Sequence, residues 1–203
     1  MQIVLGTHNK KKLFELDLLL GPLGFTLKTL ADFPEAIEVE ETGTTFAENA
    51  RLKATVQAKH LHQWVLGEDS GLSVDALDGK PGVYSARFAG PDATDEDNNE
   101  KLLQELEGVP FAERTAHYTS HITLSDPTGQ VMIECEDYCH GIIDTKLSGS
   151  GGFGYDPMFI IPEYDLTFGQ LGNDIKSILS HRARAMRRFI PELLSIQARH
   201  ADE

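Results

Sequence analysis

The fold is decided first by the stretch QIVLGTHNKKKLFELDLLLGP, residues 2–22. Its apolar opening, Gln2 to Gly6, predicts a short buried strand, and Thr7 to Lys12 predicts a turn. Leucines then recur at helical spacing, which predicts a helix over Lys10 to Leu20 that stops at the following Gly-Pro pair. A strand that leads directly into a helix is typical of an α/β unit.

The rest of the chain continues this alternation and then adds a hairpin, which predicts an α/β fold with a mixed sheet flanked by helices. Ligands in such folds favour loops at strand ends. We further expect strands at 25–30 and at 64–67, the second of which presents Glu68 to Gly71 at its end. Strands at 114–124 and 131–142, joined by a turn at 126–129, form the hairpin. Helices are expected from the Thr45–Glu48 capping box to about His62, from the cap at Thr94 and Asp97 to Gly108, and from a cap at Ser180 onward, bent or restarted near Pro191.

Length and composition set limits on the kind of protein. The 203 residues suit one domain, or two closely joined lobes, and a net charge of -14 argues against sequence-independent binding of nucleic acid. No apolar run approaches the roughly 18 residues that span a membrane, and Met1 to Gly6 lacks the features of a secretory signal. We therefore expect a cytoplasmic protein with no membrane partner.

The cysteines and two histidines fall on the expected hairpin strands. On an extended strand the Cα atoms of Cys135 and Cys139 lie roughly 13 Å apart, too far for a disulfide, which fits a reducing compartment. With His117 and His121 they suggest a zinc site, but structural zinc ligands usually occur in tighter pairs on turns. Ordinary strand residues are the better interpretation.

A basic cluster, Thr7-His8-Asn9-Lys10-Lys11-Lys12, lies between the first strand and the first helix. Free backbone N–H groups and the helix dipole favour an anion at a helix N-terminus, where lysines are otherwise disfavoured. The Walker A pattern is absent. The alternative is a solvated basic start to a helix, but three lysines at this end favour a phosphorylated ligand.

Two acidic clusters indicate a metal or a general base. Glu38, Glu40 and Glu41 precede the capped helix, where acids often serve only as dipole partners. Asp69 follows an apolar strand and is either a metal ligand and base or a turn-forming residue. Mg²⁺ binds one or two carboxylates together with water and phosphate oxygens, so one of these glutamates with Asp69 would suffice.

A glycine-rich aromatic segment, Gly151 to Pro157, is the candidate base-binding loop. Glycines allow close approach of a ligand to the backbone, and an aromatic between them is placed to stack on a flat ring. The alternative is a tight turn with core aromatics. Basic and hydroxyl side chains at the start of the last helix, Lys176 to Arg182, form a further cluster that a capped helix with a basic face would also explain.

These segments together resemble the Ham1-type inosine triphosphate pyrophosphatase family, in the same order and over nearly the whole chain. The matching motifs are Thr7 to Lys12, Glu41 to Ala54, Glu68 to Leu77, Pro81 to Gly90, Gly151 to Phe159 and Ser180 to Arg182. The chain differs from many bacterial members at Glu68, where an aspartate is common, and at Lys11, where glycine is common. Neither change alters the expected class of activity.

The resemblance implies a single domain over residues 1–203, with two lobes around a central cleft and usually a homodimer. It implies Mg²⁺-dependent hydrolysis of purine nucleoside triphosphates containing hypoxanthine or xanthine, to the monophosphate and pyrophosphate. The implied site residues are Thr7, His8, Asn9, Lys10, Lys11, Lys12 and Lys53 for the phosphates; Asp69 as base and metal ligand, with Ser70 beside it; Glu40 or Glu41 as a second metal ligand; Phe153, Gly154, Tyr155 and Asp156 as the base-stacking loop; and Lys176, His181 and Arg182 as readers of the base.

Donor chemistry agrees with that choice of base. Hypoxanthine and xanthine present an acceptor at position 6, whereas adenine presents a donor, and a buried donor without a partner costs roughly 1–3 kcal/mol. Guanine shares the 6-oxo group, so this argument does not explain its rejection. The preferred substrate among the inosine, deoxyinosine and xanthosine triphosphates is left open. One alternative is a related pyrophosphatase that acts on modified pyrimidine nucleotides. The other is a non-catalytic nucleotide sensor, and the carboxylates argue against this second alternative, because a protein that only binds a polyanion gains little from added negative charge.

Overall fold

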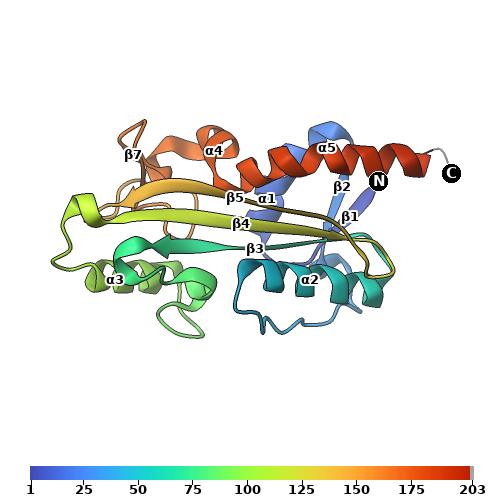
Figure 1. Ribbon diagram of the computed structural model, residues 1–203, viewed down its shortest axis with the longest axis horizontal. Coiled ribbons are helices and arrows are strands. Elements are labelled where there is room, and N and C mark those ends of the chain that lie inside the picture. The colour runs from blue at the N-terminus through green and yellow to red at the C-terminus, as the bar shows by residue number, and fades with distance from the viewer. Residues whose placement is uncertain (202–203) are drawn as a thin grey trace. The chain divides into compact units, whose positions relative to one another are not determined.

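The chain forms an α/β structure around one mixed sheet, as predicted, in a computed structural model that describes residues 1–201 (Figure 1). The sheet has seven strands in the order β2-β1-β3-β4-β5-β6-β7. The strands are β1 (Gln2–Leu5), β2 (Thr26–Thr29), β3 (Val65–Val74), β4 (Thr115–Ser125), β5 (Val131–Ile143), β6 (Phe159–Ile161) and β7 (Leu166–Thr167). The α-helices are α1 (Lys10–Leu20), α2 (Phe46–Leu61), α3 (Asp95–Glu105), α4 (Phe168–Leu179) and α5 (His181–Ala201).

Pairing within the sheet is parallel at one end and antiparallel at the other. β1 pairs in parallel with β2 and with β3, whereas β6 pairs antiparallel with β5 and with β7. β4 and β5 are neighbours joined by a turn in which the Gly129 amide donates to the Asp126 carbonyl, so the expected hairpin is confirmed. No helix within residues 1–201 is long and apolar enough to cross a membrane.

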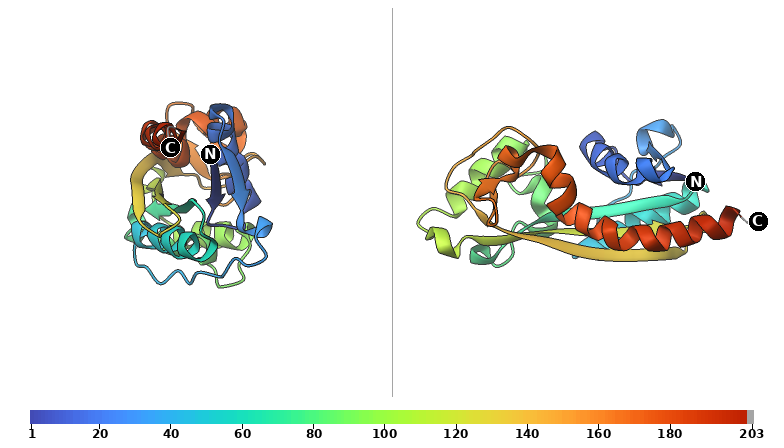
Figure 2. Two further views of the ribbon diagram at one scale, coloured as in Figure 1. Left: turned by 90° about the vertical axis from the view of Figure 1, so that its right-hand side faces the viewer. Right: turned by 90° about the horizontal axis from the view of Figure 1, so that it is seen from above.

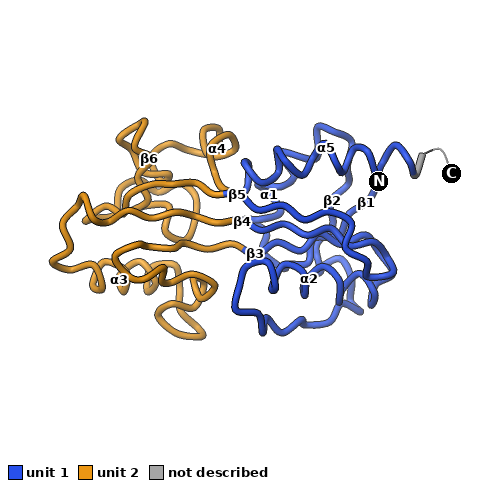
Figure 3. Tube along the Cα trace, in the orientation of Figure 1, with its two compact units in different colours: residues 1–69, 120–137, 182–203 blue, residues 70–119, 138–181 orange. Residues whose placement is uncertain are grey.

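The chain divides into two compact units, each with its own core (Figure 3). Unit 1 comprises Met1–Asp69, Ser120–Asp137 and Arg182–Glu203, and unit 2 comprises Ser70–Thr119 and Tyr138–His181. The boundaries therefore fall inside β3, β4 and β5. One of them lies directly after Asp69, the residue singled out as a candidate base.

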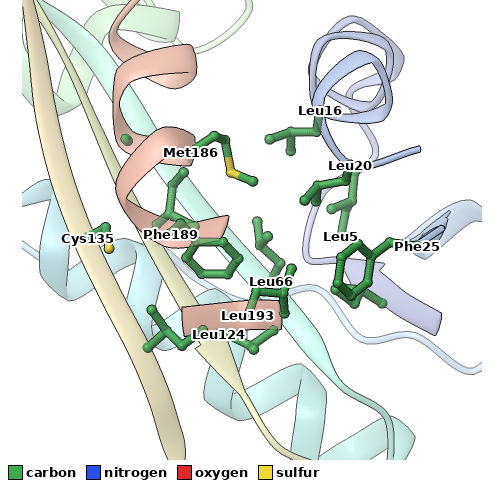
Figure 4. Packing of buried hydrophobic residues seen from close by; sticks show 14 of the residues in the cluster. Leu5, Leu16, Leu20, Phe25, Leu66, Leu124, Cys135, Met186, Phe189 and Leu193 are labelled. Atoms are coloured by element: carbon green, nitrogen blue, oxygen red, sulfur yellow. The ribbon is translucent and has the colours of Figure 1, made fainter. Parts of the chain in front are cut away.

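Unit 1 is layered because alternate residues of β1 face opposite sides of the sheet. Ile3 and Leu5 pack with α1 and α5, while Val4 packs with Ala58 of α2. Figure 2 shows α1 and α5 on one side of these strands and α2 on the other. Figure 4 shows the larger core, where leucines of α1 meet Met186, Phe189 and Leu193 of α5.

Unit 2 has an aromatic core under the β4–β5 strands. Phe159 lies 4.6 Å from Tyr118 and 5.6 Å from Phe168, measured between ring centroids. Leu102 and Leu106 bring α3 and the turn that follows it into the same core. This packing fixes α3 and α4 within the unit that carries the glycine-rich loop.

Helix caps appear where the sequence predicted them. Thr45 and Glu48 form the capping box of α2, and Thr94 and Asp97 form that of α3. α2 ends at Leu61, with His62 in the left-handed conformation, and α3 ends at Glu105, three residues before Gly108. Capping depends on residues that are close in sequence, which is why these starts were predictable.

Some elements differ from those expected. β3 does not stop at Gly67 but continues to Val74, so the motif from Glu68 to Gly71 lies within the strand. Asp69 is therefore not a turn residue. α5 continues through Pro191 as one helix and therefore does not restart there. α4, which precedes it, was not expected from the sequence because glycines interrupt its pattern; one of them, Gly172, adopts a non-helical φ of 75°.

Candidate active site

Asp69 lies on β3 facing α2, and a glycine makes this approach possible. A Cβ on Gly67 would lie 2.2 Å from the Ala50 carbonyl oxygen and 2.7 Å from the Ala54 amide nitrogen. Only glycine allows a strand and a helix to pack this closely. Asn49 and Lys53, the neighbours of Ala50 and Ala54 in α2, then reach Asp69, two residues further along the strand.

Two buried side chains of α2 bind the Asp69 carboxylate. Lys53 Nζ lies 2.8 Å from Asp69 Oδ1, and Asn49 Nδ2 donates to Oδ2 at 3.2 Å. Burial raises the pKa of Asp69, and the Lys53 charge opposes that shift. A carboxylate with a raised pKa is a stronger base, which suits it to accept a proton from water.

Lys53 is held between two acids rather than solvated as a lone helical lysine would be. Its Nζ also lies 3.4 Å from Glu41 Oε1, so Asp69 and Glu41 share one positive charge. Asn49 Oδ1 accepts from the Gly43 amide at 2.8 Å, which fixes the segment that carries Glu41. Glu40 is exposed.

This arrangement fits the metal that the resemblance implies. Two carboxylates already converge on a cation, the Lys53 ammonium, and oxygen ligands of this kind are those that Mg²⁺ prefers. Within residues 1–201 no group of three or more His, Cys, Asp or Glu side chains is placed to hold a metal. Mg²⁺ usually completes its coordination with water and substrate phosphate, so a site with two protein carboxylates suffices.

Glu68, one residue before Asp69, is the hub of a second buried network. Its Oε1 accepts from Ser120 Oγ at 3.0 Å and from Arg182 Nε at 2.9 Å. Its Oε2 lies 3.2 Å from Lys12 Nζ. Arg182 also donates to Glu15, so the guanidinium joins two carboxylates.

The charges of this network shape each other. Burial lowers the pKa of Lys12, and Glu68 opposes the shift. Burial alone would lower the pKa of Arg182, but Glu68 and Glu15 outweigh it and raise that pKa. Lys12 is thus the lysine of the N-terminal cluster that faces inward, whereas His8, Lys10 and Lys11 are exposed.

The backbone at the start of α1 differs from the expectation. Asn9 is the N-cap, and its Oδ1 accepts from the amides of Lys11 at 2.9 Å and Lys12 at 3.2 Å. Thr7 Oγ1 accepts from the Asn9 amide at 3.1 Å. The expectation of free N–H groups here was wrong for these amides, because side chains within the turn satisfy them.

In unit 2 the glycine-rich loop presents Phe153 and buries its neighbours. The Phe153 side chain is half-buried, whereas Tyr155 and Asp156 are buried. Asp156 Oδ2 accepts from the Phe153 amide at 2.8 Å and from Lys176 Nζ at 2.6 Å. Lys176 Nζ lies 4.3 Å from the Phe153 ring centroid, so one ammonium ties the carboxylate to the aromatic ring.

Three further residues of the predicted site, His181, Tyr155 and Ser70, are buried or half-buried. His181 is buried and stacks on Tyr118, with centroids 4.7 Å apart and planes 15° apart. Tyr155 donates its hydroxyl to the Ser85 carbonyl at 2.8 Å, and burial raises its pKa. Ser70 follows Asp69 on β3 and is half-buried.

Sequence reasoning missed three residues of these networks: Asn49, Ser120 and Glu15. Asn49 lies one turn before Lys53 on α2, and this spacing could have identified it as a second ligand of Asp69. Ser120 and Glu15 meet Glu68 and Arg182 only through tertiary packing. No local signal marks them.

Comparison with known proteins gives a consistent result. Residues 3–192 match the model of the Ham1 family. A dITP/XTP pyrophosphatase of Rhodopirellula baltica is 56% identical over 194 residues, 96% of this chain and 93% of that protein. One of Geobacter sulfurreducens is 50% identical over 91% of this chain and 92% of its own. A solved HAM1 protein of Coxiella burnetii superposes with a TM-score of 0.87 at 35% identity, covering 96% of this chain and 99% of that one.

Proposed function

This chain belongs to the Ham1 family, as its motifs predicted, and we propose that it is a nucleoside triphosphate pyrophosphatase acting on inosine, deoxyinosine and xanthosine triphosphates. The products are the nucleoside monophosphate and pyrophosphate, and the role is to remove non-canonical purines from the nucleotide pool. The names of relatives at 56% and 50% identity support this class of reaction.

The observation that carries the proposal is the buried carboxylate of Asp69, held by Asn49 and Lys53. Both donors fix its orientation, and its raised pKa suits a general base. Asp69 takes a proton from the water that attacks the α-phosphorus. Pyrophosphate is then the leaving group.

Asp69 and Glu41 are the residues that would hold Mg²⁺, and the contact of Glu41 with Lys53 favours it over the exposed Glu40. The ion, when bound, shields the charge of the triphosphate and lowers the pKa of a bound water. Mg²⁺ bound by Asp69 and Glu41 would take the place between these acids that the Lys53 ammonium occupies. This ammonium is then available to phosphate oxygens.

Lys12 is the main phosphate ligand of the N-terminal cluster, because it alone of its three lysines faces the buried acids. Asn9 and Thr7 support it indirectly by capping α1, and the exposed His8, Lys10 and Lys11 add positive charge around the phosphate tail. A sensor that only binds a polyanion would gain nothing from the acids Glu68 and Asp69 beside these lysines.

Phe153 is the surface on which the purine stacks, and Gly154, Tyr155 and Asp156 hold it in place. Lys176, His181 and Arg182 read the 6-oxo edge of the base. Lys176 binds Asp156 and Arg182 binds Glu68, so each would share its donors between the protein and the base. Spare N–H groups of an ammonium and a guanidinium make this possible.

We also place this enzyme in the cytoplasm, where nucleoside triphosphates are made and used, and expect a homodimer. We also propose that residues 1–203 form a single domain whose two lobes are the two compact units.

Product analysis tests the function. Inosine triphosphate with Mg²⁺ should yield equimolar inosine monophosphate and pyrophosphate, and adenosine triphosphate should react far more slowly. Excess chelator should abolish turnover, and Mg²⁺ should restore it. Release of orthophosphate, or full turnover in chelator, would contradict the proposal.

A further inference from the structure

The first turns of α3 hold the backbone of the aromatic loop at Gly154. Asp95 Oδ2 accepts from the Gly154 amide at 3.0 Å, and Asn99 Nδ2 donates to the Gly154 carbonyl at 3.0 Å. Both polar groups of one loop residue are therefore bound by side chains one helical turn apart. All of these atoms belong to unit 2.

The residues on either side of Gly154 are held as well. The Phe153 amide donates to Asp156, and the Tyr155 hydroxyl donates to the Ser85 carbonyl. Asp95 is the contact that reaches the peptide bond joining Phe153 to Gly154, because that peptide's N–H is the donor. The orientation of this peptide sets the direction in which the Phe153 ring leaves the backbone.

Gly154 requires such support because its backbone is unusual. Its φ is +59°, a region that glycine enters freely, and a Cβ there would meet nothing within 4 Å. Packing around the Cα therefore does not select this conformation. The two hydrogen bonds from α3 do so instead.

Asn99 includes a buried acceptor that destabilises the fold, so a contribution to stability does not explain this residue. It is 4% exposed, and its Oδ1 is buried without a hydrogen-bond partner within residues 1–201. An unsatisfied buried acceptor destabilises a fold. Its neighbour Asn98, equally buried, uses both amide atoms, binding the Ala86 carbonyl and the Ala89 amide.

We propose that Asp95 and Asn99 are positioning residues for the nucleobase: through Gly154 they set the Phe153 ring in the orientation in which a purine stacks. This inference rests on the proposed function, since it assumes that Phe153 receives the base. In this proposal α3 contributes to recognition of the base indirectly, through its hydrogen bonds to Gly154.

Kinetics with inosine triphosphate test the proposal, with inorganic tripolyphosphate as an inhibitor that has no base. Asp95→Ala and Asn99→Ala should each raise KM roughly tenfold, with a smaller change in kcat, tenfold being the factor that corresponds to about 1.4 kcal/mol. The inhibition constant of tripolyphosphate should stay unchanged. Asp95→Asn keeps an acceptor for the Gly154 amide and should restore most of the affinity.

Asp97→Ala is the matched control, because Asp97 lies in the same helical turn and caps α3 through Thr94 without touching the loop. Its KM should equal that of the wild type. Equal KM values for Asp95→Ala, Asn99→Ala and Asp97→Ala would overturn the inference, as would a parallel loss of tripolyphosphate inhibition. If Asp95→Ala fails to fold, the Asn99→Ala variant decides the test. This variant should fold, because it also removes the buried oxygen that has no hydrogen-bond partner. Lack of hydrolysis by the wild type would instead reject the proposed function.

Discussion

The acid–lysine cluster of unit 1 and the aromatic loop of unit 2 are built by different means. Around Asp69 the order comes from charge, since Lys53, Lys12 and Arg182 each pair with buried carboxylates. Around Phe153 it comes from the backbone, since Gly152 and Gly154 adopt left-handed conformations and side chains bind the amides of Phe153 and Gly154. We infer that the first region governs the chemical step and the second governs affinity for the base.

The largest effect should come from Asp69→Asn. The amide cannot take a proton from water, so kcat should fall at least about 100-fold, the lower range for loss of general-base catalysis. The melting temperature should change little, because Asn still accepts from Asn49 and Lys53 keeps Glu41 as its acidic partner. Steady-state kinetics and thermal unfolding measure the two quantities. Glu134→Gln, which alters a carboxylate of unit 1 bound to Arg51 instead, should leave kcat intact.

Breaking the charge network should reduce stability. Lys53→Met leaves Asp69 buried without its cation, and loss of one partner of a buried pair costs about 3 kcal/mol in the free energy of unfolding. Arg51→Met is the control on the same helix, because the Arg51–Glu134 pair is more exposed and should contribute about 1 kcal/mol or less. Equal losses in urea denaturation would show that the Lys53 pair is no more important than a surface pair.

The aromatic loop should respond in KM rather than in kcat. Phe153→Ala removes the stacking surface, worth about 1–3 kcal/mol for a base on an aromatic ring. KM for inosine triphosphate should rise accordingly, and inhibition by tripolyphosphate should not change. A fall in kcat with constant KM would place Phe153 in the chemical step and remove the contrast between the regions.

The smallest effect should appear at alkaline pH. Burial lowers the pKa of Lys12 below 10.5, so Lys12 loses its charge, and with it phosphate affinity, at a lower pH than an exposed lysine. KM for inosine triphosphate should therefore rise as pH increases towards 10.5. Lys12→Arg stays charged and should shift this rise to higher pH. An unchanged profile would show that Lys12 does not bind the phosphates.

The two regions also differ in what the sequence could predict. Capping boxes and the glycine-rich loop are local patterns, so α2, α3 and the position of Phe153 were predictable. The extent of β3 was not, because Glu68 and Asp69 break its apolar run and only pairing across the sheet keeps them in a strand. The partners of Glu68 come from residues 52 and 114 positions away, which no local pattern encodes.

The family resemblance suggested Lys53 as a site residue, whereas its position as a lone lysine on a helix suggested a solvated side chain. Its burial follows from the approach of α2 to Gly67, a contact between distant segments. The proposal of Glu41 rather than Glu40 as a metal ligand likewise rests on the position of Lys53. The order of motifs was therefore enough to indicate the family and the reaction, whereas the assignment of individual side chains required the fold.

Hydrolysis of inosine triphosphate in ¹⁸O-labelled water tests the central claim most directly. Attack on the α-phosphorus by water activated at Asp69 places the label in inosine monophosphate, and mass spectrometry of the products should find it there alone. Label in pyrophosphate or orthophosphate, with none in the monophosphate, would contradict a pyrophosphatase that attacks at the α-position.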